Sequence, residues 1–248
     1  MMLNSKSGMV AFMIDNTREK YIDNLMKTYR LVNVLADKND CKTIRLRHRK
    51  KGQDIVLHSF PKGVFAYEKL HKIQNENLPL IYDVINLDDG QIVLEEYVEG
   101  LTVAQVMESG KYTFHGARKV IEAVCNALSV LHSQGIIHRD IKPENIIIQK
   151  NGRIVLIDFN ASRKKSYNSK DTVVMGTVGY ASPEQLGISQ TDERTDIYAL
   201  GILFNVMLTG AHPSEMLATG KAGKIVKKCT QINQNERYQT VKNLFEAL

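Results

Sequence analysis

The strongest constraint on this chain is the stretch His-Arg-Asp-Ile-Lys-Pro-Glu-Asn at residues 138–145. Two short apolar runs follow it, at residues 146–148 and 154–157, and Asn151-Gly152 lies between them. Short runs rich in β-branched residues around an Asn-Gly pair predict a β-hairpin with a tight turn. The chain is therefore expected to reverse direction after the 138–145 stretch and to return beside it.

The predicted hairpin brings four polar side chains together at its open end. Asp140, Lys142 and Asn145 precede its first strand, and Asp158 follows its second strand. Carboxylate and amide oxygens suit Mg²⁺, and an ammonium group offsets phosphate charge. The sequence therefore predicts a site for a metal-bound polyphosphate at this end of the hairpin.

With three later segments, these residues resemble the eukaryotic-type serine/threonine protein kinases, in the compact form found in bacteria. The later segments are Gly-Thr-Val-Gly-Tyr-Ala-Ser-Pro-Glu at 176–184, Thr-Asp-Ile-Tyr-Ala-Leu-Gly at 195–201 and Glu-Arg-Tyr at 236–238. They follow the family's order and cover roughly the C-terminal two thirds of the chain. The resemblance implies an α+β, bilobal kinase-like fold, with a small antiparallel β-sheet N-lobe carrying one main helix and a larger, mainly helical C-lobe.

The same resemblance sets the expected domain bounds: a partly helical N-terminal extension over residues 1–28, then one kinase domain over 29–248. Its N-lobe is expected over 29–97 and its C-lobe over 98–248. In the extension, Asn16 and Glu19 have the spacing of a capping box. Apolar patterns predict strands over 29–35, 43–48, 54–60, 78–87 and 91–96, and helices over 117–131, 196–208, 225–229 and 241–248. The resemblance implies a further helix over 62–74.

The resemblance also implies a role for each residue of the site. Asp140 orients the substrate hydroxyl and accepts its proton, while Lys142 contacts ATP and steadies the transferred phosphoryl group. Asn145, also counted as catalytic, and Asp158 hold Mg²⁺. The further ATP-binding residues are the backbone groups of Glu96 and Val98 for the adenine, and the side chains of Lys42, His58 and Glu68.

The predicted N-lobe departs from the family pattern. The glycines that let a loop approach phosphate closely are replaced by Ala36, Lys38 and Cys41. His58 stands where the third strand of the family carries a lysine, and Glu68 stands for the glutamate of the helix at 62–74. Two interpretations of Lys42 stay open: the displaced phosphate-binding lysine, as in the kinases that lack the strand lysine, or a surface residue. Glu95, at the back of the expected pocket, must either find a cation or reshape the pocket, because a buried unpaired carboxylate is costly.

The expected activation segment runs from Asp158 to Glu184. Arg139 is expected to receive a phosphate from this segment, and the candidate acceptors are Ser166, Ser169 and Thr172. Glu184 is expected to pair with Arg237, and His138 to support the loop rather than act as a base. Asn160 replaces a glycine of the family and tolerates a positive φ. Thr177 favours serine or threonine as the acceptor.

Composition limits the other possibilities. The three cysteines, at 41, 125 and 229, are too far apart for a zinc site or a disulfide framework. The apolar run at 9–14 is too short for a membrane span, so a cytoplasmic protein without a membrane partner is expected. The net charge of +6 comes largely from basic residues at 45–51, which are interpreted as a solvated hairpin tip rather than a nucleic-acid site.

These features support one leading function and two alternatives. The leading interpretation is a kinase that transfers the γ-phosphate of ATP, with Mg²⁺, to serine or threonine of a protein substrate, its own chain included. The first alternative is a pseudokinase that serves as a nucleotide-binding or interaction module, which His58 and the absent glycines favour. The second is a kinase for a small molecule. The complete C-lobe set of Asp140, Lys142, Asn145 and Asp158 favours an enzyme.

Overall fold

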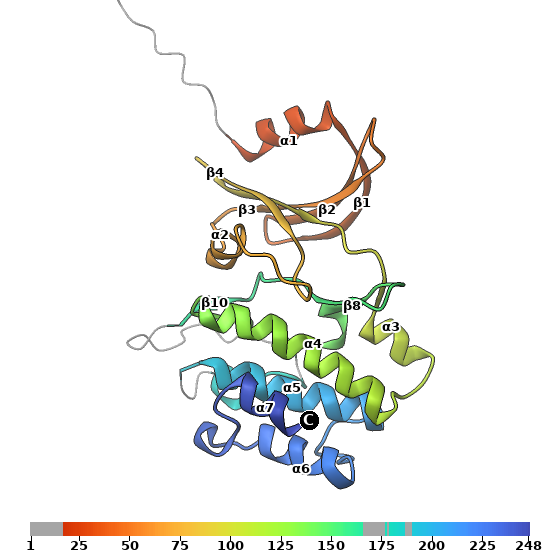
Figure 1. Ribbon diagram of the computed structural model, residues 1–248. Coiled ribbons are helices and arrows are strands. Elements are labelled where there is room, and N and C mark those ends of the chain that lie inside the picture. Colours follow the sequence, from red (N-terminus) through yellow and green to blue (C-terminus); the bar gives the residue numbers. More distant parts are fainter. Residues whose placement is uncertain (1–16, 166–176, 178, 187–189) are drawn as a thin grey trace, which may run out of the picture.

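The computed structural model describes residues 17–165, 177, 179–186 and 190–248. Its smaller lobe is a five-stranded antiparallel sheet in the order β1-β2-β3-β5-β4. The strands are β1 (Tyr29–Lys38), β2 (Cys41–His48), β3 (Asp54–Phe60), β4 (Ile81–Leu87) and β5 (Gly90–Glu96). The helices α1 (Arg18–Met26) and α2 (Phe65–Leu70) flank this sheet, and the helical lobe lies below it (Figure 1).

Helix α1 covers the outer face of the sheet. Its apolar side chains pack on a cluster formed by alternate strand positions, among them Ile44, Leu46, Leu57 and Ile92. The expected helix is therefore confirmed, and it buries a face that would otherwise lie open. Its N-cap is Thr17, whose side chain makes no capping hydrogen bond. Asn16, from which the capping box is expected, lies outside the described residues.

Helix α2 is much shorter than the helix expected over 62–74. It runs only from Phe65 to Leu70 and buries Ala66, Tyr67 and Leu70. After a turn at 71–72, the chain is held in a non-helical path toward the hairpin: the Asn77 backbone N–H donates to Asn75 Oδ1 at 2.8 Å, and Asn77 Nδ2 donates to Ile154 O at 2.8 Å. These side-chain bonds compete with the backbone ladder of a helix.

The larger lobe is built around two long helices. Helix α4 (Phe114–Ser133) buries one apolar face, which includes Ala117, Val120, Ile121, Val124, Leu128 and Leu131. Helix α5 (Glu193–Thr209) is apolar nearly all round and ends at Gly210, whose φ of 77° forms a left-handed C-cap. The remaining helices are α3 (Val103–Glu108), α6 (Gly220–Cys229) and α7 (Val241–Ala247), with short 3₁₀ turns η1 (Pro143–Asn145), η2 (Pro183–Leu186) and η3 (Gln234–Glu236). Helix α6 begins before the expected 225–229 segment.

The predicted hairpin lies on this lobe, next to the sheet lobe. It consists of β8 (Ile146–Ile148) and β9 (Ile154–Leu156), which pair antiparallel, and β6 (Leu101–Thr102) joins them as a third strand. Gly152 in the turn has a φ of 87°, which only glycine adopts readily. A second small pair, β7 (Ile136–Ile137) with β10 (Arg163–Lys164), fixes the start of the 138–145 loop.

Candidate active site

The backbone around the hairpin is strained at two points. Arg139 and Asp158 have φ values of 69° and 67°, and they are two of the four non-glycine residues with positive φ in the described part of the chain. A left-handed backbone at such residues persists only where the surrounding structure holds it. Arg139 and Asp158 lie on either side of the segment that contains Asp140, Lys142 and Asn145. The strained backbone at both residues is therefore a cost in stability that accompanies the placement of this segment.

Asp140 is the centre of a dense polar network. Its Oδ2 lies 2.7 Å from Lys142 Nζ and accepts a hydrogen bond from Asn145 Nδ2 at 3.0 Å. Its Oδ1 accepts from Thr177 Oγ1 at 2.7 Å, and Lys142 Nζ in turn donates to Thr177 Oγ1 at 3.0 Å. Burial alone would raise the pKa of Asp140, but the hydrogen bonds from Lys142, Thr177 and Asn145 together hold that pKa below its ordinary value.

Asp196 supports this loop from beneath. It is fully buried in α5, and its two carboxylate oxygens accept the backbone N–H of His138 at 3.0 Å and of Arg139 at 2.8 Å. His132 Nε2 lies 2.8 Å from Asp196 Oδ2. Burial opposes ionisation, but the His132 contact and these hydrogen bonds lower the pKa of Asp196 overall. The sequence contained this residue in the 195–201 segment, yet nothing in that segment indicated that it holds the loop.

His138 has the structural role expected of it. Its backbone position precedes Asp140, whose N–H donates to His138 Nδ1 at 3.3 Å. The ring Nε2, which then carries the proton, lies 3.3 Å from Ile157 O. Because burial lowers the pKa of His138, the neutral ring bridges the loop and the hairpin and takes no part as a base.

A cavity of about 510 Å³ lies between the lobes, beside this network. Apolar side chains of Val56 and Ile147 line it together with the connecting segment Glu96–Val98. The Val98 backbone N–H has no hydrogen-bond partner in the described part of the chain, so it can serve a ligand. The shape and lining suit a flat heterocycle, which apolar walls hold and a few backbone groups orient.

The inner end of this cavity carries two oxygen donors that fit a divalent cation. Asn145 and Asp158 both line the cavity. Asn145 Nδ2 is used by Asp140, which leaves Asn145 Oδ1 without a hydrogen-bond partner in the described part of the chain. Among the described residues, Asp158 Oδ1 accepts only the Asn160 N–H, at 3.2 Å. Hard oxygens of this kind suit Mg²⁺, which keeps several waters and takes one or two protein ligands.

His58 and Glu95 form a buried pair at the back of the cavity. His58 Nε2 lies 2.9 Å from Glu95 Oε1, close enough for an ion pair although the two groups are not aligned for a hydrogen bond. His58 Nδ1 also lies 3.0 Å from Thr43 Oγ1. The His58 ring thus lies directly against the buried carboxylate. Among the described residues, neither lysine nor arginine lines the cavity.

The interpretation of Lys42 as the displaced lysine is wrong. Across the β2–β3 ladder, Thr43 is opposite His58 and Lys42 is opposite Ser59, so Lys42 points to the other face of the sheet. Its side chain is half exposed, and its Nζ lies 3.8 Å from Asp37 Oδ2, outside the cavity. A one-residue difference in register exchanges the two faces of a strand, and Thr43 faces the site instead.

Glu68, expected to be an ATP-binding residue, does not line the cavity. Helix α2 turns Tyr67 inward, against Phe159 with ring centroids 5.6 Å apart, and leaves Glu68 exposed. Glu68 Oε1 accepts weak hydrogen bonds from Asn86 and Gln91, both at 3.4 Å. His58 therefore pairs with a neighbouring strand, not with a helix.

Comparison with known proteins decides the family. A family model described as "Protein kinase domain" matches residues 29–247. The chain belongs to the protein kinase family. It is 35% identical over 171 residues to a probable serine/threonine-protein kinase of Clostridium perfringens, and 32% identical over 171 residues to the probable serine/threonine-protein kinase PknB of Lactococcus lactis. It is 34% identical over 173 residues to the serine/threonine-protein kinase PknB of Mycolicibacterium smegmatis. Each alignment covers 68% of this chain but only 24%, 27% and 26% of the relative, respectively.

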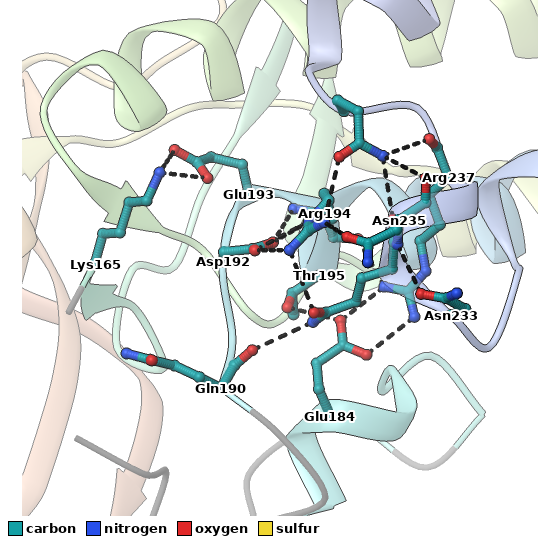
Figure 2. Close-up of polar contacts among 12 residues, drawn as sticks. Lys165, Glu184, Gln190, Asp192, Glu193, Arg194, Thr195, Asn233, Asn235 and Arg237 are labelled. Atoms are coloured by element: carbon teal, nitrogen blue, oxygen red, sulfur yellow. Dashed lines mark hydrogen bonds and ion pairs between the residues drawn. The ribbon is translucent and has the colours of Figure 1, made fainter. Parts of the chain in front are cut away.

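The kinase domain ties its activation segment to the helical lobe by the expected ion pair. Arg237 Nη1 and Nη2 donate to the two oxygens of Glu184 at 2.7 and 3.0 Å, and both side chains are buried (Figure 2). Thr195 Oγ1 also donates to Glu184, at 2.9 Å. Burial opposes ionisation of Glu184, but the bonds from Arg237 hold its pKa below the ordinary value. In the same view, Lys165 lies 2.6 Å from Glu193 and connects the other end of the segment to α5.

Arg139 of the kinase loop has a buried, unsatisfied guanidinium group. Its Nε and Nη2 have no hydrogen-bond partner in the described part of the chain, and burial together with the nearby charge of Arg163 lowers its pKa. A buried guanidinium group with free donors is suited to bind an anion such as a phosphate group. The candidate acceptors Ser166, Ser169 and Thr172 lie outside the described residues.

Part of the basic cluster at 45–51 is neutralised within the sheet. Arg45 and Arg47 both bond Asp54, and these hydrogen bonds, that of Arg47 foremost, lower the pKa of Asp54 to about 2. Arg45 also stacks on Tyr97, 3.9 Å from the ring centroid, and Arg49 donates to Met26 O and Tyr29 O. These arginines therefore have structural partners. No helix in the described part of the chain has the length and hydropathy needed to cross a bilayer.

Proposed function

We propose that this chain is a cytoplasmic, ATP- and Mg²⁺-dependent kinase that transfers the γ-phosphate to serine or threonine of a protein substrate. The observation that carries the proposal is the Asp140 network with Lys142, Asn145 and Thr177. A carboxylate held ionised by three donors can orient a hydroxyl and accept its proton. The names of the kinase relatives support the same acceptor class.

The residues divide the work of phosphoryl transfer. Asp140 aligns the acceptor hydroxyl, and Lys142, 2.7 Å from it, offers charge to the transferred group. The apolar walls and the Val98 N–H hold the base of the nucleotide. Asn145 and Asp158 would hold Mg²⁺, which would offset phosphate charge. Thr177 Oγ1 is hydrogen-bonded to both Asp140 and Lys142. This position of Thr177 beside the two residues supports serine or threonine of a protein as the phosphate acceptor.

The pseudokinase alternative is supported less well. His58 in place of a lysine favours it, because a neutral imidazole offers phosphate no charge. However, the Asp140 network is complete, and the strained residue Arg139 lies next to Asp140 and not in the cavity. The acid–base set of a transferase would have no physical purpose in an idle site.

Phosphate incorporation from labelled ATP, into the chain itself and into a basic protein substrate, tests the proposal. Asp140→Asn should lower incorporation by about 100-fold or more, since it removes the proton acceptor. Lys42→Met should leave incorporation close to that of the wild type, because Lys42 faces away from the cavity. Phosphoserine or phosphothreonine should be the product. No incorporation by the wild type would favour the pseudokinase.

We propose in addition that a phosphate on the activation segment binds Arg139. Two nitrogens of the buried guanidinium have no hydrogen-bond partner among the described residues, which supports this, since such a group is costly until an anion pairs with it. Substituting Ser166, Ser169 and Thr172 together by alanine should lower the rate of substrate phosphorylation at least several-fold. An unchanged rate in the triple variant, with stoichiometric phosphorylation of the wild type checked by mass spectrometry, would contradict this part of the proposal.

A further inference from the structure

We infer that Arg18 is a positioning residue for ATP: it holds the tip of the β1–β2 hairpin, at residues 38–41, in place beside the cavity between the lobes. The inference rests on the proposed binding of ATP in that cavity. Arg18 lies in helix α1 and precedes residues 29–247, which match the kinase family model. The family pattern therefore assigns this residue no role.

The β1–β2 hairpin forms one wall of the cavity. Leu35, Ala36 and Thr43 line the cavity, and Ala36 is opposite Thr43 in the ladder. The tip begins two residues further along each strand, which is about 7 Å away. A displacement of the tip therefore displaces the wall that a bound nucleotide contacts.

Strand β1 gives this hairpin little support of its own. It is an edge strand of the sheet, and its residues 30–38 are all exposed. Its ladder with β2 contains two register shifts. Within the tip, only Cys41 is partly buried, and it packs against the main core. Burial of apolar side chains therefore contributes little to fixing the tip.

Arg18 binds the tip from the outer face of the sheet, where helix α1 lies (Figure 1). Its Nη2 donates to Asp40 Oδ2 at 2.9 Å, and its Nη1 donates to Asp40 O at 3.2 Å. The Arg18 backbone N–H and Nε donate to the two carboxylate oxygens of Asp89, in the β4–β5 turn, at 2.8 and 3.2 Å. Its Nη1 also donates to Ser59 Oγ of β3 at 3.3 Å. One guanidinium group, whose side chain is only 13% exposed, thus joins the tip to the body of the sheet.

In the described part of the chain, no other side chain from outside the hairpin hydrogen-bonds residues 38–41. A tip that is free to move must be ordered when a nucleotide binds, and this ordering weakens the affinity. Arg18 orders the tip before ATP arrives, so the wall of the cavity is already in place. Once ATP is bound, the tip is ordered with or without Arg18. Arg18 should therefore affect the affinity for ATP more than the rate of transfer from bound ATP.

The test measures Mg²⁺–ATP binding to the full chain by calorimetry, and hydrogen exchange of residues 37–43 without nucleotide by mass spectrometry. Arg18→Met should raise the Kd for ATP by about threefold to tenfold and speed the exchange. The kcat of phosphate incorporation should stay within about twofold. The matched control is Arg49→Met, which removes an arginine that donates to Met26 O and Tyr29 O, at the opposite end of β1 from the tip. It should leave both the Kd and the exchange unchanged.

The inference requires both changes in Arg18→Met, with the variant shown to be folded by its thermal transition. Weaker ATP binding with unchanged exchange would overturn it, because the lost positive charge alone would then explain the affinity. Faster exchange with unchanged affinity would overturn it as well, and so would equal changes in Arg49→Met or a wild type that does not bind ATP. Failure of the proposed phosphoryl transfer looks different. A wild type whose ATP binding depends on Arg18, but which gives no Asp140-dependent incorporation, would support the inference and contradict the proposed enzyme.

Discussion

At the scale of single residues, the position of Asp140 depends on the buried carboxylate of Asp196, which lies beneath the loop. Asp196 accepts two backbone N–H groups of the loop and contacts His132. The loop contains Arg139 in a left-handed conformation, so these acceptors offset its strain. A loss at Asp196 should therefore affect both the stability of the domain and the position of Asp140.

Asp196→Asn should lower the free energy of unfolding by about 2–4 kcal/mol, because an amide has one acceptor where two buried N–H groups and His132 need partners. Urea unfolding followed by circular dichroism measures this change. The matched control is Glu122→Gln, at a partly exposed partner of Arg118, which should change stability by less than about 0.5 kcal/mol. Equal effects of the two variants would contradict the support role of Asp196.

The effect of Asp196→Asn should depend on pH. The folded pKa of Asp196 lies below the ordinary value of 3.8. The ionised group therefore stabilises the fold above about pH 4. That contribution is lost as the pH falls from 3.8 through the lower folded pKa. The difference in stability between wild type and variant should be largest near neutral pH and should shrink below pH 4.

The sequence predicted residues on local motifs well and residues on sheets less well. Asp140, Lys142, Asn145 and Asp158 follow one another along a loop and a hairpin, so their proximity is set by a tight turn. By contrast, the His58–Glu95 pair joins two strands that are distant in sequence. The face on which Lys42 lies depends on a register that a single residue reverses. Such cross-strand facts are not contained in a local pattern.

At the scale of elements, the tie between η2 and the segment after α6 holds the activation segment to the helical lobe. Arg237→Met should lower the free energy of unfolding by about 3–5 kcal/mol, because it leaves the Glu184 carboxylate buried without a cation. The double variant Glu184→Gln with Arg237→Met should be more stable than Arg237→Met alone. A double variant that is less stable than Arg237→Met would mean that the unpaired Glu184 carboxylate does not destabilise the single variant. Thermal unfolding of the single and double variants makes the comparison.

The long helices and the hairpin could be predicted from the sequence because their patterns are strong. The apolar positions of α4 and α5 are buried as expected. Helix α2 could not be predicted well: its end depends on the bond from Asn77 to the distant Ile154 O. The position of α1 on the outer face of the sheet could also not be predicted, because an amphipathic pattern does not indicate which surface of the protein the helix covers.

At the scale of the whole molecule, the sheet lobe and the helical lobe contribute different parts of one site. The sheet lobe supplies Val56, His58 and Glu95 around the base, and the helical lobe supplies the Asp140 network. Nucleotide binding and phosphoryl transfer should therefore be separable by substitution. The relatives are about four times as long as the aligned segment. The predicted separation of nucleotide binding from phosphoryl transfer applies to the kinase domain alone.

The most direct measurement compares ATP affinity and phosphate incorporation in the wild type and in Asp140→Asn. Asp140 lies outside the residues that line the cavity. ATP affinity should therefore stay within about threefold of the wild type, while incorporation falls by about 100-fold or more. Incorporation that persists in Asp140→Asn would contradict the assignment of Asp140 as the base. An equal loss of affinity and incorporation would contradict the division of the site between the two lobes.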